Sequence, residues 1–204
     1  EEHGEIVGDD PESRWIIDPL DGTTNFLHGI PHFAISIALE QRGELVAGIV
    51  YDPLRDEMFW AEKGVGAYVN RQRLRVSARP KLGNAVFATG IPFGQRRGKK
   101  AFMAMLAAAM ERTAGVRRFG AASLDLAYLA AGRYDAFWEV GLSPWDVAAG
   151  IVLVREAGGL ISDIKGGSAM LYGASIVAAN ERLHRDALAL LRDALSDAGL
   201  DALD

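Results

Sequence analysis

Trp15-Ile16-Ile17-Asp18-Pro19-Leu20-Asp21-Gly22-Thr23 is the stretch of this chain that decides its fold and its chemistry. The apolar run Trp15–Ile17 predicts a short buried strand, which we expect to stop at Pro19 because proline cannot donate to a ladder. Pro19 fixes one backbone angle and Gly22 permits an unusual one, so the turn can aim two carboxylates and a carbonyl at one point. Hard divalent cations such as Mg²⁺ prefer such oxygen ligands.

The same segment also has the potential to hold an anion. If the amides of Gly22 and Thr23 open a helix, their N–H groups form a seat for a phosphate. The simpler interpretation is a plain turn, because Asp-Pro and Asp-Gly are common turn dipeptides. Both dipeptides together, directly after an apolar strand, favour a site over a turn.

A second segment with site character is Ser143-Pro144-Trp145-Asp146. Ser143 suits an N-cap, Pro144 suits the first helical position, and Asp146 falls in the first turn. Taken alone, this pattern favours an Asp146 that only caps the helix and complements its dipole. The pairing with Asp18 and Asp21 is what favours a shared metal site.

The remaining pattern predicts one compact domain over residues 1–204, with two styles of structure. Residues 1–84 indicate mainly antiparallel sheet, including a hairpin formed by residues 32–39 and 45–51. Residues 85–204 alternate strands with helices. We expect these helices over residues 99–113, 123–131 (with Ser123 as N-cap), 144–157 and 181–195.

Composition narrows the class of function. The chain has 22 basic and 27 acidic residues and no polybasic tail, so nucleic-acid binding is not expected. An acidic protein can still take an anionic substrate when metal ions supply the positive charge. There is no cysteine, which excludes disulfides and Cys-ligated metal centres and fits a cytoplasmic setting. No apolar run is long enough to span a bilayer, so no membrane role is expected.

These motifs resemble those of the inositol monophosphatase family. Residues 15–26 resemble its first signature, and residues 145–150 followed by 156–159 resemble its second. Residues 51–53, 64–68 and 177–180 extend the resemblance over nearly the whole chain. The resemblance implies an α/β layered sandwich (α-β-α-β-α) of the sugar-phosphatase fold, shared with fructose-bisphosphatases. It also implies a homodimer, Mg²⁺ dependence and inhibition by lithium.

The resemblance assigns roles to individual residues. The implied metal ligands are Glu1, Asp18, the carbonyl of Leu20, Asp21 and Asp146. Thr23 would orient the attacking water beside Asp21, and the amides of Gly22 and Thr23 would hold the phosphate. The residues implied to contact the substrate are Gly120, Ala121, Ala122, Glu139 and Asp146. Three alternatives stay open. Glu2 could take the place of Glu1, Glu1 and Glu2 could be two exposed terminal charges, and Glu139 could be only a surface charge at a strand end.

The implied reaction is hydrolysis of a phosphate monoester by metal-activated water, without a protein nucleophile. Thr24-Asn25-Phe26 resembles the inositol type, so the expected substrate is a phosphorylated polyol, inositol monophosphate. The alternatives are histidinol phosphate, fructose bisphosphate, a nucleotide 3′-phosphate, or a non-catalytic regulatory module on the same fold. Relatives carry helices before the Glu-Glu motif, whereas this sequence begins at Glu1 without Met, so we expect an N-terminal segment to be missing.

Overall fold

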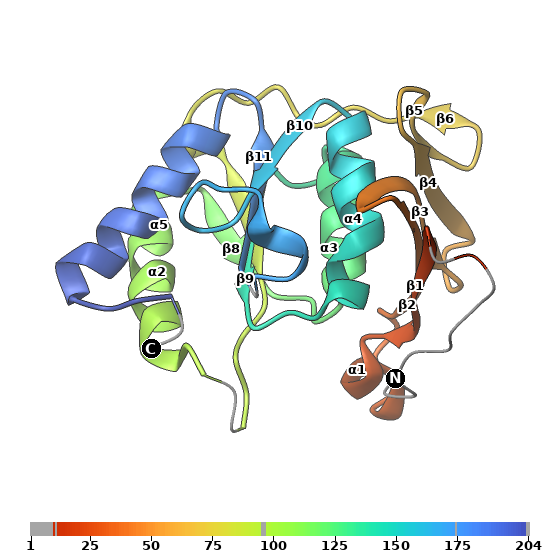
Figure 1. Ribbon diagram of the computed structural model, residues 1–204. Coiled ribbons are helices and arrows are strands. Elements are labelled where there is room, and N and C mark those ends of the chain that lie inside the picture. Colours follow the sequence, from red (N-terminus) through yellow and green to blue (C-terminus); the bar gives the residue numbers. More distant parts are fainter. Residues whose placement is uncertain (1–9, 11, 95–96, 174, 203–204) are drawn as a thin grey trace.

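The computed structural model describes residues 10, 12–94, 97–173 and 175–202. Two β-sheets alternate with two helical layers, as Figure 1 shows from right to left. This arrangement confirms the layered α/β sandwich. Of the five layers expected, the described residues supply four, since none of the described helices covers the outer face of the first sheet.

The first sheet has six antiparallel strands, and their order in the sheet follows the chain. Neighbours in sequence are therefore neighbours in space, and the expected hairpin is confirmed by the pairing of the second and third strands. The strands are β1 (Ser13–Asp21), β2 (Ala34–Gln41), β3 (Glu44–Asp52), β4 (Glu57–Glu62), β5 (Gly66–Val69) and β6 (Gln72–Arg73).

Strand β1 corrects the expectation of a fully buried strand that stops at Pro19. Ile16 is buried, but Trp15 is 63% and Ile17 51% exposed, because only one face of the strand meets the interior. The strand continues to Asp21, and its pairing with β2 shifts register between Asp18 and Asp21. Pro19 is tolerated because β1 is an edge strand with one partner, and the extra residue forms a bulge.

The second sheet has five strands and mixed pairing, in the order β10-β11-β9-β7-β8. Strand β7 is parallel to β8 and to β9, whereas β11 is antiparallel to β9 and to β10. The strands are β7 (Val86–Thr89), β8 (Gly115–Arg117), β9 (Ala136–Val140), β10 (Gly159–Ser162) and β11 (Ser175–Asn180).

The helices divide into those between the sheets and those on the far side of the second sheet (Figure 1). Between the sheets lie α3 (Ala122–Ala130) and α4 (Pro144–Glu156); beyond lie α2 (Lys99–Arg112) and α5 (His184–Ala198). The short elements are α1 (Thr23–Leu27) and two 3-10 turns, η1 (Leu82–Asn84) and η2 (Ala169–Leu171). The four longer helices thus form where the pattern predicts them, and α5 starts a few residues late.

Close packing of α4 explains how its first turn is brought to the end of β1. A Cβ added to Gly48 of β3 would lie 2.7 Å from the carbonyl oxygen of Ala149, so the strand and the helix touch through backbone. A Cβ added to Gly150 would lie 2.4 Å from the side chain of Leu126 on α3. Glycine at both positions allows these elements to approach, and any larger side chain would separate them.

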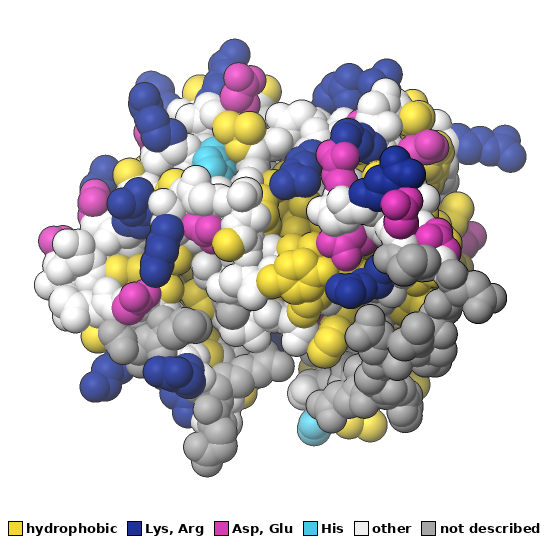
Figure 2. All heavy atoms as spheres, in the orientation of Figure 1, with side chains coloured by type: hydrophobic (Ala, Val, Ile, Leu, Met, Phe, Trp, Pro, Cys, Tyr) yellow, Lys and Arg dark blue, Asp and Glu magenta, His cyan; other side chains and the backbone are white. Residues whose placement is uncertain are grey.

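The surface carries both charges and apolar side chains. On the face shown in Figure 2, Lys and Arg side chains are interspersed with Asp and Glu, without a continuous basic area among the described residues. The outer face of the six-stranded sheet carries an apolar row across five strands, which runs through Ile17, Ile37, Ile49, Trp60 and Tyr68. Among the described residues, no helix has the length and apolar character needed to cross a membrane.

Candidate metal centre

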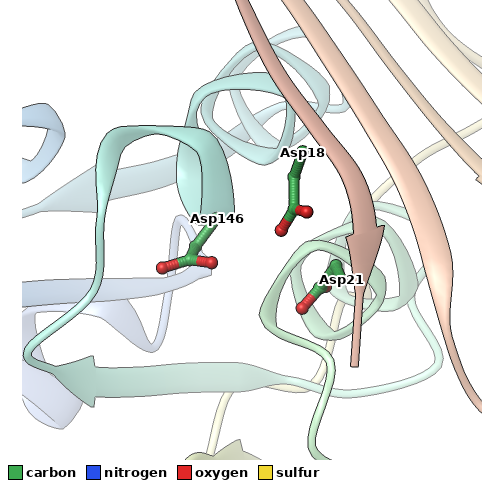
Figure 3. A group of neighbouring side chains, drawn as sticks. All are labelled: Asp18, Asp21 and Asp146. Atoms are coloured by element: carbon green, nitrogen blue, oxygen red, sulfur yellow. The ribbon is translucent and has the colours of Figure 1, made fainter. Parts of the chain in front are cut away.

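Three carboxylates meet between the end of β1 and the start of α4. Asp18 and Asp21 flank the bulge of β1, and Asp146 lies in the first turn of α4, with one oxygen of each within 4.8 Å of the others (Figure 3). Asp18 and Asp21 are buried, at 2% and 6% exposure, and Asp146 is half-buried. The structure therefore brings together two residues from one short segment and a third from more than a hundred residues later.

The turn after Asp18 is held by its own side chains. The backbone N–H of Leu20 donates to Asp18 Oδ1 at 3.1 Å, and the Thr23 hydroxyl donates to the carbonyl of Leu20 at 3.1 Å. Gly22 has φ +84°, a left-handed conformation that glycine adopts without strain, and α1 begins directly after it. The expected helix start at Gly22-Thr23 is thus present, and the Thr23 hydroxyl lies beside the Leu20 carbonyl.

Asp21 is held from the other side of the site by α3. Its Oδ2 accepts the backbone N–H of Ser123 at 2.8 Å and the Ser123 hydroxyl at 2.6 Å. Burial, and to a smaller degree the charges of Asp146 and Asp18, raise the pKa of Asp21 to about 7 despite these two hydrogen bonds. Ser123 is therefore not the N-cap that its type suggests: the helix begins at Ala122, and Ser123 in its first turn donates to a distant carboxylate instead.

Asp146 serves its own helix as well as the cluster. Its Oδ2 accepts the backbone N–H of Ser143 at 2.7 Å, and Pro144 takes the first helical position. The predicted cap is thus confirmed, and the second carboxylate oxygen leaves Asp146 with capacity for another partner. Ser36 on β2 links this helix to β1. It is the register partner of Asp18, and the Ser36 hydroxyl donates to the carbonyl of Trp145 at 3.2 Å.

Three of the residues expected to contact the substrate, Gly120, Ala121 and Ala122, lie at the start of α3. A Cβ added to Gly22 would lie 3.3 Å from the Cβ of Ala121, so the segment Gly120–Ala122 abuts the turn that carries the carboxylates. Asn25 ties the two together, since its Nδ2 donates to the carbonyls of His32 and Phe119 at 2.8 Å each.

Glu139, near the end of β9, is half-buried. Burial, and to a smaller degree the charges of Glu139 and Asp21, raise the pKa of Asp125 on α3, so Glu139 acts on the same buried acid as Asp21 does. Glu1 lies outside the described residues.

Sequence reasoning missed three positioning residues: Ser36, Ser123 and Asn25. Each is a buried polar side chain, and such groups are almost always hydrogen-bonded. Asn25 and Ser36 stand among apolar neighbours, which is a weak signal for burial. Nothing local in the sequence identifies their partners, which lie 94 and 109 residues away.

The donor set suits a hard divalent cation. The side chains of the cluster offer only carboxylate oxygens, the type of ligand that Mg²⁺ and Ca²⁺ accept. Burial is the main cause of the raised pKa of Asp21, and the two hydrogen bonds from Ser123 do not offset it. A cation among the three carboxylates would compensate the negative charge of Asp21.

Comparison with known proteins identifies the family. The model of the inositol monophosphatase family matches residues 1–196. The chain is 53% identical over 196 residues to an inositol-1-monophosphatase of Mesorhizobium japonicum, covering 96% of this chain and 74% of that protein. It is 49% identical over 198 residues to a Salmonella typhimurium protein named Nus factor SuhB, covering 97% of this chain and 74% of the relative.

A solved structure adds the fold. The extragenic suppressor protein suhB from Bartonella henselae superposes with a TM-score of 0.91 at 52% identity, over 94% of this chain and 75% of that one. The resemblance seen in the two motifs is thereby confirmed over nearly the whole chain. This protein belongs to the inositol monophosphatase family and is a phosphoric monoester hydrolase.

Proposed function

We propose that this chain hydrolyses an inositol monophosphate to inositol and inorganic phosphate in a magnesium-dependent reaction. The observation that carries the proposal is the convergence of Asp18, Asp21 and Asp146 beside the start of α1. Similarity to proteins named inositol-1-monophosphatase supports the choice of substrate.

Asp18, Asp21, Asp146, the Leu20 carbonyl and Glu1 are the groups that we assign to magnesium. Bound there, magnesium supplies positive charge that lowers the pKa of water and stabilises the departing alkoxide. The chain's contribution is to keep two of these carboxylates in place before the metal arrives: Asp21 is fixed by Ser123, and Asp146 by the backbone of Ser143. Such preorganisation avoids reorganisation during the reaction.

Thr23 is assigned to orienting the attacking water. Its hydroxyl proton is donated to the Leu20 carbonyl, so its oxygen is the group that can accept a hydrogen bond from a water molecule. The amides of Gly22 and Thr23, at the start of α1, are assigned to the phosphate. The alcohol portion of the substrate then lies toward Gly120–Ala122 and Glu139, where the Glu139 carboxylate accepts hydrogen bonds from hydroxyl groups.

The proposal is tested by phosphate release from four esters in the presence of magnesium: inositol 1-phosphate, histidinol phosphate, fructose 1,6-bisphosphate and adenosine 3′-phosphate. We expect the highest kcat/KM on inositol 1-phosphate. Asp18→Asn is expected to lower turnover on every ester. Asp193→Asn, at an exposed position on α5, is the matched control and should behave as wild type. Preference for the nucleotide would overturn the assignment of inositol 1-phosphate as substrate. Full activity of Asp18→Asn would overturn the assignment of the metal site.

A second candidate is a regulatory or interaction role on the same fold, favoured by the relatives named Nus factor SuhB. Magnesium titration by calorimetry separates the two candidates. Binding that is lost in Asp18→Asn supports the enzyme, because an interaction module has no need of three converging carboxylates. Absence of binding by the wild-type protein would favour the module.

Three further properties follow from the family resemblance and belong to the same proposal. We expect a homodimer, lithium inhibition and a cytoplasmic setting, the last supported by the absence of cysteine. Sedimentation analysis and phosphate release in the presence of lithium chloride test the first two directly.

A further inference from the structure

Strands β7 and β9 bring two residues together at their carboxyl ends. The strands are parallel, and Thr89 is the register partner of Trp138. The next residue along each strand is Gly90 and Glu139, so these two positions lie side by side. Carboxyl ends of parallel strands are where α/β proteins commonly place ligand-binding groups.

The Glu139 carboxylate occupies the space that a side chain at Gly90 would need. A Cβ built on Gly90 would lie 1.9 Å from Oε1, 2.0 Å from Cδ and 2.3 Å from Oε2 of Glu139. All three atoms belong to the carboxylate and none to the stem of the side chain. The carboxylate therefore rests directly against the Cα of Gly90.

Backbone conformation does not explain the glycine at this position. Gly90 is absent from the glycines with positive φ, so its backbone is one that other residues can adopt. It is also buried, and its carbonyl accepts the hydroxyl of Thr89 at 3.1 Å. What requires glycine here is the space for Glu139.

A second acid interacts electrostatically with Glu139. Asp125 on α3 is 1% exposed, and burial, together with the charges of Glu139 and Asp21, raises its pKa. A Glu139 carboxylate displaced toward this buried acid would meet stronger like-charge repulsion. Because Glu139 is only half-buried, its carboxylate can instead move toward solvent.

We propose that Gly90 is a positioning residue for the alcohol portion of the substrate: it leaves room for the Glu139 carboxylate to stand where the substrate's hydroxyl groups bind. The inference rests on the proposed function, which assigns Glu139 to those hydroxyls. It identifies a residue outside both signature motifs that contributes to selection of polyol phosphates over simpler phosphate esters.

The test compares Gly90→Ala with wild type on two esters, inositol 1-phosphate and phenyl phosphate, which has no such hydroxyls. Loss of a hydrogen bond to a charged acceptor weakens binding of the polyol by about tenfold, so we expect KM for inositol 1-phosphate to rise by about that factor with little change in kcat. The preference for inositol 1-phosphate over phenyl phosphate, measured as the ratio of their kcat/KM values, should therefore also fall by about tenfold. Magnesium affinity, measured by calorimetry, should stay within about twofold of wild type.

A double-mutant cycle shows whether Gly90 acts through Glu139. In a Glu139→Ala background the added methyl group meets no carboxylate. Gly90→Ala should then lower kcat/KM for inositol 1-phosphate by less than about twofold. Gly83→Ala in η1 is the control, because a Cβ there has nothing within 4 Å and the backbone needs no positive φ. Additive effects in the cycle, or an equal loss on both esters, would overturn the proposal.

Two further outcomes are informative. If Gly90→Ala fails to fold, recovery of folding in the double variant supports the steric argument, and failure of both variants overturns it. If wild type prefers a different ester that carries hydroxyls, the assignment of inositol falls, and the cycle is run on that ester. Failure of the proposed function thus appears in the wild-type ranking, and failure of this inference appears in the cycle.

Discussion

Helices α3 and α4 both begin at the carboxylate cluster, but their first turns are stabilised in different ways. In α4 the carboxylate comes from the helix itself, since Asp146 accepts the N–H of Ser143 three residues earlier. In α3 it comes from β1, because Asp21 accepts the N–H of Ser123 across 102 residues. Carboxylates at both positions are favoured by the positive end of the helix dipole.

The difference shows how one site combines local and long-range order. The cap of α4 requires only a few consecutive residues, so it can form wherever that helix forms. The bond between Asp21 and α3 exists only when β1 and α3 are packed together. Asp21 is also the more buried acid and the one whose pKa is raised to about 7. It links metal binding to the assembled fold, whereas Asp146 links it to one helix.

Replacement of Asp21 should produce the largest effect. Asp21→Asn removes a charge from the metal site but keeps an oxygen that can accept from Ser123, so the fold should survive. We expect kcat/KM for the preferred phosphate ester to fall by about a thousandfold, since the metal supplies several kcal/mol of stabilisation to the transition state. Phosphate release and calorimetric magnesium titration measure the two effects. Near wild-type activity would remove Asp21 from the metal site.

Acid should weaken magnesium binding through Asp21. Because its pKa is raised to about 7, the carboxyl carries a proton below that pH, and magnesium must displace it. We expect the Kd for magnesium to increase by up to about tenfold for each pH unit below 7 and to level off above it. Calorimetry in buffers of different ionisation enthalpy should detect proton release near pH 6 and little at pH 8. A Kd that does not vary with pH would contradict this coupling.

The two serines test the comparison directly. Ser123→Ala removes one of two donors to Asp21, which should raise the pKa of Asp21 further and shift the magnesium titration to higher pH. We expect about a tenfold loss of magnesium affinity at pH 7 and about 1 kcal/mol of stability. Ser143→Ala, at the local cap, should cost a similar stability but leave the affinity within about twofold. Equal losses of magnesium affinity would contradict the distinction between the long-range contact of Ser123 and the local cap of Ser143.

The difference between local and long-range contacts also explains which features could be predicted from the sequence. The strand-end turn, the hairpin and the cap at Ser143 depend on residues within a few positions of one another, and their patterns predicted them. The predicted end of β1 at Pro19 was wrong because an edge strand tolerates proline. Whether a strand lies at an edge depends on the whole sheet. Metal-site roles for Asp18 and Asp146 stay predictions, although the structure brings both carboxylates together.

Apart from the grouping of Asp146 with Asp18 and Asp21, the sequence did not predict contacts between distant segments. Ser123 has the residue type of an N-cap, and nothing near it indicates that its partner is Asp21. Gly90 resembles any glycine at a strand end until the register of β7 with β9 places Glu139 beside it. The sequence therefore shows which reactive groups the chain has. Tertiary packing decides which of them form hydrogen bonds or lie in contact.

The smallest predicted effect concerns Ser36, which joins β2 to the start of α4. Ser36→Ala leaves the Trp145 carbonyl without its hydroxyl donor, and we expect a loss of about 1 kcal/mol in the free energy of unfolding. Because Ser36 is the register partner of Asp18, the change should also loosen the spacing between Asp18 and Asp146. Magnesium affinity should fall by about threefold, a loss of less than 1 kcal/mol.

Ser196→Ala on α5 is the control for Ser36→Ala, since its side chain is exposed and far from the carboxylates in sequence. Chemical denaturation should show that this control is as stable as wild type or slightly more so, because alanine favours helix. If Ser36→Ala lowers stability without changing magnesium affinity, the hydroxyl only strengthens packing, and the spacing of Asp18 and Asp146 is set by Gly48 and Gly150 alone. A matched loss of both would place Ser36 with Ser123 among the residues that hold the metal site through tertiary structure.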